Sequence, residues 1–222
     1  REEMRGAIEF SDVHFSYVPG EPVLRGFDLS VKPGQKVAIV GATGSGKTTV
    51  VNLLTRFYEP DSGSITVDGV SIADIPKDEL RRSIAIVLQD TVLFSDSIRA
   101  NIKYGRLEAD DAEMRKAAAT ANADVFIERL PEGYDTILAE SGSNLSQGQR
   151  QLLSIARAVL ADPKILILDE ATSSIDTRTE LKISDAFAKL MEGKTSFIVA
   201  HRLSTIMDAD IIHVVDKGKI VA

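Results

Sequence analysis

The chain has 222 residues, of which 44% are hydrophobic, and a formal net charge of −7 at pH 7. This length and composition can supply a buried core for one large domain or two small ones, so a disordered chain is excluded. The chain has no cysteine, which excludes disulfides and thiolate metal sites, and no block of like charges, which argues against a nucleic-acid-binding tail. Its apolar runs fall far short of the roughly 18 residues of a membrane span.

Near the N-terminus, apolar residues alternate with polar ones. The apolar residues Ile8 and Phe10 stand at even positions, and Val13 and Phe15 stand at odd ones. The alternation returns at 27–31. This period of two is typical of half-buried antiparallel strands. We therefore predict an antiparallel β subdomain at this end of the chain.

After a Lys-Pro-Gly turn the pattern changes to continuous apolar runs, which are typical of parallel strands buried on both faces. These runs lie at 37–40, 84–88, 165–168, 197–200 and 211–215. Helical periodicity lies between them, at 47–57, 110–123 and 147–161. The sequence therefore predicts an α/β fold, with a parallel-sheet core, the N-terminal antiparallel β subdomain, and an α-helical subdomain inserted at about 91–160. Ser146 and Gln149 have the spacing of a capping box at the start of the last helix.

A glycine-rich segment fits the phosphate-binding pattern G-x-x-x-x-G-K-[ST], and it stands between a predicted buried strand and a predicted helix. Glycines let the backbone wrap closely around phosphates, so that its N–H groups and the helix N-terminus bind anionic oxygens. Lys47 would reach the β- and γ-phosphates, and the Thr48 hydroxyl would bind Mg²⁺. The predicted nucleotide-binding residues here are Gly41, Ala42, Thr43, Gly44, Ser45, Gly46, Lys47, Thr48 and Thr49.

Polar residues follow three other predicted parallel strands, at the edge of an α/β sheet where ligands bind. Asp169 would hold Mg²⁺, and Glu170 would orient the attacking water as a general base. Gln89 would bind Mg²⁺ or the water through its amide, with a solvated loop residue as the alternative. His201 would donate a hydrogen bond to the γ-phosphate in the transition state, although most isolated histidines have no such role.

The segment Leu-Ser-Gln-Gly-Gln at 145–149 resembles the LSGGQ signature of ABC ATPases, and its place between the phosphate loop and Asp169 follows the order of that family. The resemblance covers 1–222 as one ABC ATPase domain, which implies a P-loop NTPase fold with a RecA-like core. Tyr17 matches the aromatic A-loop, 41–48 the Walker A motif, Gln89 the Q-loop and 165–170 the Walker B motif. Residues 173–176 look like the D-loop, and His201 looks like the switch histidine.

The resemblance implies a head-to-tail dimer with a second ABC ATPase domain. Each ATP would lie between one phosphate loop and the partner's signature residues, which here are Ser146, Gly148 and Gln149. Tyr17 would stack on the adenine, and Mg²⁺ would accompany the ATP.

The sequence that follows Gln89 most resembles that of exporter-type members of the family. This implies a motor domain at the cytoplasmic face of the cell membrane, in contact with a transmembrane domain through residues near Thr91 to Phe94. The two ends of the chain look cut from a longer protein. The resemblance implies no nucleic acid as a partner.

One residue departs from the family pattern. Gln147 stands where the signature commonly has glycine, so it would perturb the partner's nucleotide site while this chain's own Lys47 and Glu170 are intact. We therefore hypothesise a heterodimeric exporter in which this half supplies the competent Walker motifs, with a homodimer that tolerates glutamine at this position as the alternative.

Three alternatives belong to other functional classes. An importer's ATPase subunit fits the same motifs but usually reads differently after Gln89. A DNA-repair ABC ATPase would carry a long coiled coil or a basic insertion, whereas the stretch from Gln89 to Leu145 is short and not basic. A regulatory module that binds ATP without hydrolysis would be expected to lack Glu170.

Overall fold

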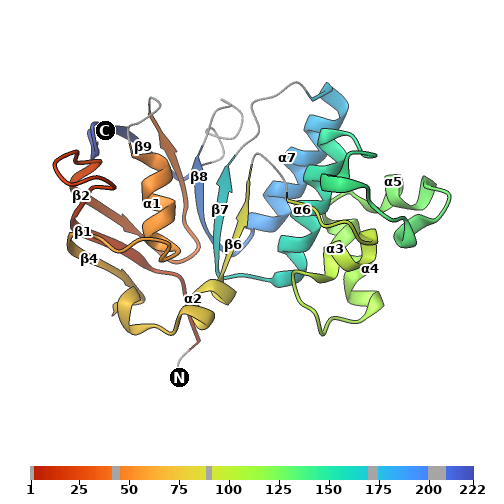
Figure 1. The fold of residues 1–222 in the computed structure, drawn as a ribbon, viewed down its shortest axis with the longest axis horizontal. Coiled ribbons are helices and arrows are strands. Elements are labelled where there is room, and N and C mark those ends of the chain that lie inside the picture. Colours follow the sequence, from red (N-terminus) through yellow and green to blue (C-terminus); the bar gives the residue numbers. More distant parts are fainter. Residues whose placement is uncertain (1–2, 42–45, 89–91, 170–174, 200–208) are drawn as a thin grey trace. The chain divides into compact units, whose positions relative to one another are not determined.

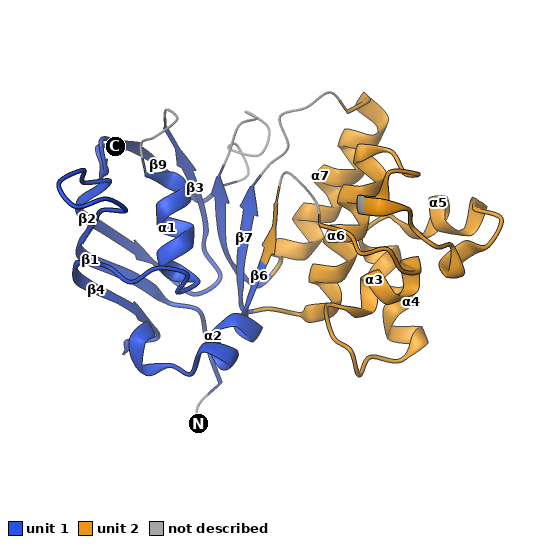
Figure 2. Cartoon of the chain, in the orientation of Figure 1, with its two compact units in different colours: residues 1–85, 164–170, 193–222 blue, residues 86–163, 171–192 orange. Residues whose placement is uncertain are grey.

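The computed structural model describes residues 3–41, 46–88, 92–169, 175–199 and 209–222 (Figure 1). The chain divides into two compact units, coloured separately in Figure 2. Unit 1 comprises residues 1–85, 164–170 and 193–222, and unit 2 comprises residues 86–163 and 171–192. Within the described ranges, no helix is both long enough and apolar enough to cross a lipid bilayer.

An antiparallel sheet forms the N-terminal part of unit 1, as the alternating pattern predicts. Its four strands have the order β2-β1-β4-β5. They are β1 (Ile8–Phe15), β2 (Leu24–Val31), β4 (Ser62–Val67) and β5 (Val70–Ser71).

The reversal of parity within β1 has a structural cause. The register shifts between Phe10 and Val13, and Asp12 has a left-handed φ of 47°, which together form a β-bulge. Gly63 lies opposite the bulge with φ 85°, and a Cβ there would stand 2.2 Å from the Asp12 carbonyl oxygen. The bulge therefore requires glycine on the neighbouring strand.

A second sheet contains the predicted parallel strands. Its six strands have the order β10-β9-β3-β8-β7-β6, and β10 pairs with β9 in the antiparallel sense. They are β3 (Lys36–Val40), β6 (Ile84–Val87), β7 (Ile165–Asp169), β8 (Thr195–Val199), β9 (Ile211–Asp216) and β10 (Lys219–Ile220). The central strands β3, β8 and β7 are almost fully buried, as their continuous apolar runs predict. β9 is less buried than predicted, because it lies next to the short edge strand β10.

Two helices complete unit 1, α1 (Lys47–Leu54) and α2 (Lys77–Ser83). Figure 1 shows α1 between the antiparallel sheet and the strands of the second sheet, and it buries Thr49, Val50, Leu53 and Leu54. The prediction of a helix to residue 57 is wrong by three residues. Arg56 takes a left-handed φ of 59°, and Thr55 hydrogen-bonds back to the Val51 carbonyl, so the helix ends there.

Unit 2 is helical in its described part. Its helices are α3 (Ile98–Lys103), α4 (Asp111–Thr120), α5 (Asp124–Arg129), α6 (Gln147–Ala161) and α7 (Thr177–Met191). The long helix α6 packs against α3, α4 and α7.

The helix predicted over 110–123 ends at Thr120. Asn122 takes a left-handed φ of 58°, and its amide donates to the Lys182 carbonyl and the Asp185 carboxylate on α7. A tertiary contact, which local periodicity cannot show, therefore fixes this boundary.

Candidate nucleotide-binding site

The two ends of the phosphate loop are joined by Lys47. Its Nζ donates to the carbonyl oxygen of Gly41 at 2.6 Å, across the segment 42–45, which lies outside the described residues. Gly46 has φ 113°, and a Cβ there would stand 2.9 Å from Cδ2 of Leu24 on β2. Backbone conformation and close packing therefore both require glycine at position 46.

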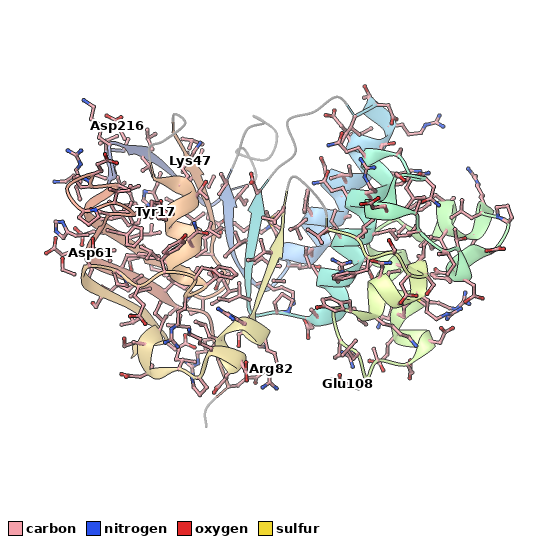
Figure 3. All side chains as sticks on the ribbon, viewed as in Figure 1. Tyr17, Lys47, Asp61, Arg82, Glu108 and Asp216 are labelled. Carbon is pink, nitrogen blue, oxygen red and sulfur yellow. The ribbon has the colours of Figure 1, made fainter. Side chains whose placement is uncertain are left out.

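Among the described residues, no side chain caps the N-terminus of α1. Its N-cap is Gly46, which has no side chain to occupy the first-turn N–H groups, and the first turn carries no acidic residue. These N–H groups and the positive end of the helix favour a bound phosphate. Lys47 is partly exposed and Thr48 is exposed, and Figure 3 shows Lys47 at this end of the helix. The local structure thus fits the binding of phosphate oxygens.

The carboxylate of Asp169 stands at the same edge of the sheet as this loop. In the parallel ladders, Ile39 of β3 and Asp169 of β7 both pair with Val199 of β8. Asp169 therefore lies about 10 Å from Ile39, two strand spacings away, and the loop begins two residues after Ile39, at Gly41. A carboxylate here and the exposed hydroxyl of Thr48 supply the oxygen ligands that Mg²⁺ prefers. These two residues therefore fit the predicted metal site.

An aromatic cluster contains the predicted adenine-stacking residue. Tyr17 follows β1, and its ring lies 4.7 Å from that of Phe15 and 5.0 Å from that of Tyr58, at interplanar angles of 88° and 89°. The residue is 44% exposed, so ring surface remains for a flat base. The sequence analysis did not identify Tyr58 as a member of this cluster. The aromatic pair Phe57-Tyr58, shortly after α1, could have indicated it.

The signature residues begin α6 in unit 2, and the predicted capping box is confirmed. Ser146 Oγ accepts from the Gln149 N–H, and Gln149 Oε1 accepts from the Ser146 N–H, each at 3.1 Å. A Cβ on Gly148 would stand 2.3 Å from Cγ2 of Thr179 on α7. Helix packing within unit 2 therefore requires glycine at position 148, independently of any role in nucleotide binding.

Several predicted site residues have no structural description here. Residues lying outside the described ranges are Ala42, Thr43, Gly44, Ser45, Gln89, Thr91, Glu170 and His201. Their roles in the site remain predictions from the sequence. The described candidate residues of unit 1 are the loop ends, α1, Asp169 and Tyr17, and those of unit 2 are the signature residues at the start of α6.

A family model described as "ABC transporter" matches residues 24–173, which is more than half of the chain. The chain belongs to the ABC transporter family. This confirms the resemblance drawn from the signature segment and the Walker motifs, and with it the prediction of an ABC-type ATPase domain that binds nucleotide.

Named relatives and a solved structure extend this finding. The chain is 57% identical to the "Uncharacterized ABC transporter ATP-binding protein YfiC" of Bacillus subtilis, over 97% of this chain and 36% of that protein. It is 55% identical to the "Fatty acid ABC transporter ATP-binding/permease protein" of Mycobacterium bovis, over 98% of this chain and 34% of that protein. The structure of a bacterial Atm1-family ABC exporter with ATP bound superposes with a TM-score of 0.92 and 44% identity, over 98% of this chain and 38% of that one.

These similarities confirm the predicted α/β P-loop fold, and the relative of solved structure is an ABC exporter, in line with the predicted resemblance to exporter-type members. The chain spans about a third of the length of the curated relatives it matches. The relatives are transporters, which implies association of such domains with a membrane.

Proposed function

We propose that the chain binds MgATP and hydrolyses it as the nucleotide-binding domain of an ABC exporter, at the cytoplasmic face of the membrane. The observation that carries the proposal is the phosphate cradle: Lys47 Nζ donates to the Gly41 carbonyl, and α1 begins after Gly46 with no side-chain cap among the described residues. The likeness to an exporter with ATP bound supports it.

The proposed reaction is in-line attack of water on the γ-phosphoryl group. The α1 N–H groups and the Lys47 ammonium bind phosphate oxygens and stabilise the negative charge that spreads over them in the transition state. Thr48 and Asp169 would hold Mg²⁺, which when bound neutralises charge on the β- and γ-phosphates. Glu170, predicted from the sequence, would orient the water, with Gln89 and His201 beside the γ-phosphate.

Two substitutions separate binding from turnover. Lys47→Ala should weaken MgATP binding by at least tenfold, because a charge-assisted contact to phosphate is lost. Glu170→Gln should keep ATP binding and nearly abolish hydrolysis. Calorimetric titration and phosphate release measure the two properties, and wild-type turnover in Glu170→Gln would contradict the assignment of the general base.

For the second ATPase domain we propose a head-to-tail arrangement, in which Ser146, Gly148 and Gln149 act on the partner's ATP. The start of α6 is the positive end of the helix dipole, which favours a γ-phosphate there. Gln147, the first residue of α6, is bulkier than the usual glycine, so we propose a heterodimer. A homodimer of the full-length transporter with substrate-stimulated ATPase activity would contradict the heterodimer.

For the contact with the membrane part we propose an exposed apolar surface at the start of unit 2. Val92, Phe94 and Tyr104 are 61%, 40% and 59% exposed, and the last two rings lie 4.6 Å apart. The name "ATP-binding/permease" of the Mycobacterium bovis relative shows that such domains occur in one protein with a permease. This apolar surface extends the predicted contact at 91–94.

Asn101, which is buried, and Arg157, which is partly buried, support this surface. Asn101 is 1% exposed, and its side chain accepts from Phe94 N–H at 2.8 Å and donates to the Phe94 and Ser97 carbonyls at 3.1 and 2.9 Å. Arg157 on α6 donates to the Asn101 and Val92 carbonyls at 2.9 and 2.8 Å, and burial lowers the pKa of its guanidinium. The apolar surface is therefore held in one conformation.

A paired measurement tests this contact. Val92→Ser with Phe94→Ser should leave the ATPase activity of the isolated chain within about twofold. In the full-length transporter the same pair should abolish stimulation by transported substrate. Intact stimulation would show that the membrane part binds elsewhere.

A further inference from the structure

The hydroxyl of Tyr17 is hydrogen-bonded to two residues of α1. Asn52 Nδ2 donates to it at 3.0 Å, and Thr49 Oγ1 lies 3.0 Å from it, where either hydroxyl can be the donor. Tyr17 itself follows β1 of the antiparallel sheet. These bonds therefore tie the tyrosine to the helix that begins at Lys47, and Figure 3 shows Tyr17 beside that helix.

Asn52 also holds the second aromatic residue of the cluster. Its backbone carbonyl accepts from the Phe57 N–H at 3.0 Å and the Tyr58 N–H at 3.4 Å, in the turn where α1 ends. The Tyr58 ring packs edge-on against the Tyr17 ring. This contact constrains the ring of Tyr17, whereas the hydrogen bonds constrain its hydroxyl. One residue thus contacts Tyr17 through its side chain and positions Tyr58 through its backbone.

We propose that Asn52 is a positioning residue for the base of the nucleotide. It anchors the Tyr17 hydroxyl on α1, one helical turn beyond Thr48, and so fixes the stacking ring relative to the phosphate cradle at the start of the same helix. A ring that is ordered before the ligand arrives loses less freedom on binding, which raises affinity for ligands that carry a base. The inference rests on the proposed binding of ATP.

A merely structural role for Asn52 would change the ligand affinities in a different way. If Asn52 only stabilised α1, its loss would weaken every ligand of the phosphate cradle alike. If it positions Tyr17, the loss would weaken ATP and spare inorganic tripolyphosphate, which has the phosphates but no base. The ratio of the two affinities therefore separates the roles.

The experiment is calorimetric titration of the chain with ATP and with inorganic tripolyphosphate, both with Mg²⁺. The variants are Asn52→Leu, which keeps the bulk and removes the donor, Tyr17→Phe, which keeps the ring and removes the hydroxyl, and the double variant. The control is Phe57→Leu. Phe57 is an exposed aromatic residue next to Tyr58, but the Phe57 ring packs on Arg81. Thermal unfolding confirms that each variant is folded.

We expect Asn52→Leu to weaken ATP binding about threefold to tenfold, the worth of one hydrogen bond, and to leave tripolyphosphate binding within about twofold. Because both changes act on one hydroxyl, the double variant should bind ATP like Tyr17→Phe alone. The control should change neither affinity.

Three results would overturn the proposal: unchanged ATP affinity in Asn52→Leu, an equal loss for both ligands, or losses that multiply in the double variant. If the unmodified chain bound no ATP, the proposed function itself would be contradicted. The two failures are therefore distinguishable.

Discussion

Replacing Asn101 with alanine removes the side chain that supports the exposed apolar surface of unit 2. In the folded chain this amide accepts from the Phe94 N–H and donates to the Phe94 and Ser97 carbonyls, all at 3.1 Å or less. Alanine can neither accept nor donate, and the site is closed to solvent. The Phe94 N–H therefore loses its partner, and the Phe94 and Ser97 carbonyls each lose a donor while keeping the backbone N–H of Asp96 and of Asn101.

The expected cost follows from these three bonds. A hydrogen bond in a folded protein contributes about 1 kcal/mol net. Asn101→Ala should therefore lower the free energy of unfolding by about 3 kcal/mol. Asn144 is a matched control in the same unit, because its amide likewise binds backbone groups, at Ala139 and Ile137, but the residue is exposed. Water can replace these bonds, so Asn144→Ala should cost less than about 1 kcal/mol.

The assay is urea unfolding followed by circular dichroism, with the midpoint and slope fitted for each variant. The reasoning requires a lower midpoint for Asn101→Ala than for Asn144→Ala at the same slope. Equal midpoints for the two variants would refute it, because burial of the amide would then have no energetic consequence.

Three further predictions concern glycine, a helix cap and pH. Gly46→Ala should weaken MgATP binding at least tenfold because of the contact with Leu24, whereas Gly20→Ala, also at positive φ but in open space, should leave binding unchanged in a titration. Ser146→Ala should lower the free energy of unfolding by about 1 kcal/mol in urea, and Ser146→Asp should restore it. Hydrogen bonds from the Thr179 side chain and then its backbone N–H hold the pKa of Asp176 below its ordinary 3.8. A carboxyl with a lowered pKa stabilises the fold above its unfolded-state pKa and loses that effect as pH falls through the folded value, so Asp176→Asn should flatten the loss of thermal stability in acid.

Local sequence patterns predicted the elements whose causes are local. The alternation predicted the antiparallel strands, whereas the bulge between Phe10 and Val13, with its left-handed φ at Asp12, was found only in the structure. The spacing of Ser146 and Gln149 predicted the cap of α6, and both of its hydrogen bonds are present. These features depend on neighbours a few residues apart, which a sequence shows directly.

Contacts between distant residues could not be predicted in this way. Asn122 ends α4 by bonding to α7 about 60 residues later, and Arg157 binds the carbonyl of Val92 across 65 positions. The bond between Tyr17 and Asn52 joins a loop to a helix. Asparagine and arginine are common on surfaces, so the sequence alone gave no sign that these side chains support a site.

The most direct test of the proposed function is MgATP hydrolysis by the isolated chain, measured per molecule against protein concentration, beside Glu170→Gln. The account predicts that both proteins bind ATP and that only the unmodified chain hydrolyses it. A rate per molecule that rises with concentration would show that two copies of this chain form an active dimer, and would contradict the proposed heterodimer. Absence of ATP binding in the unmodified chain, or equal turnover in the two proteins, would contradict the proposed function.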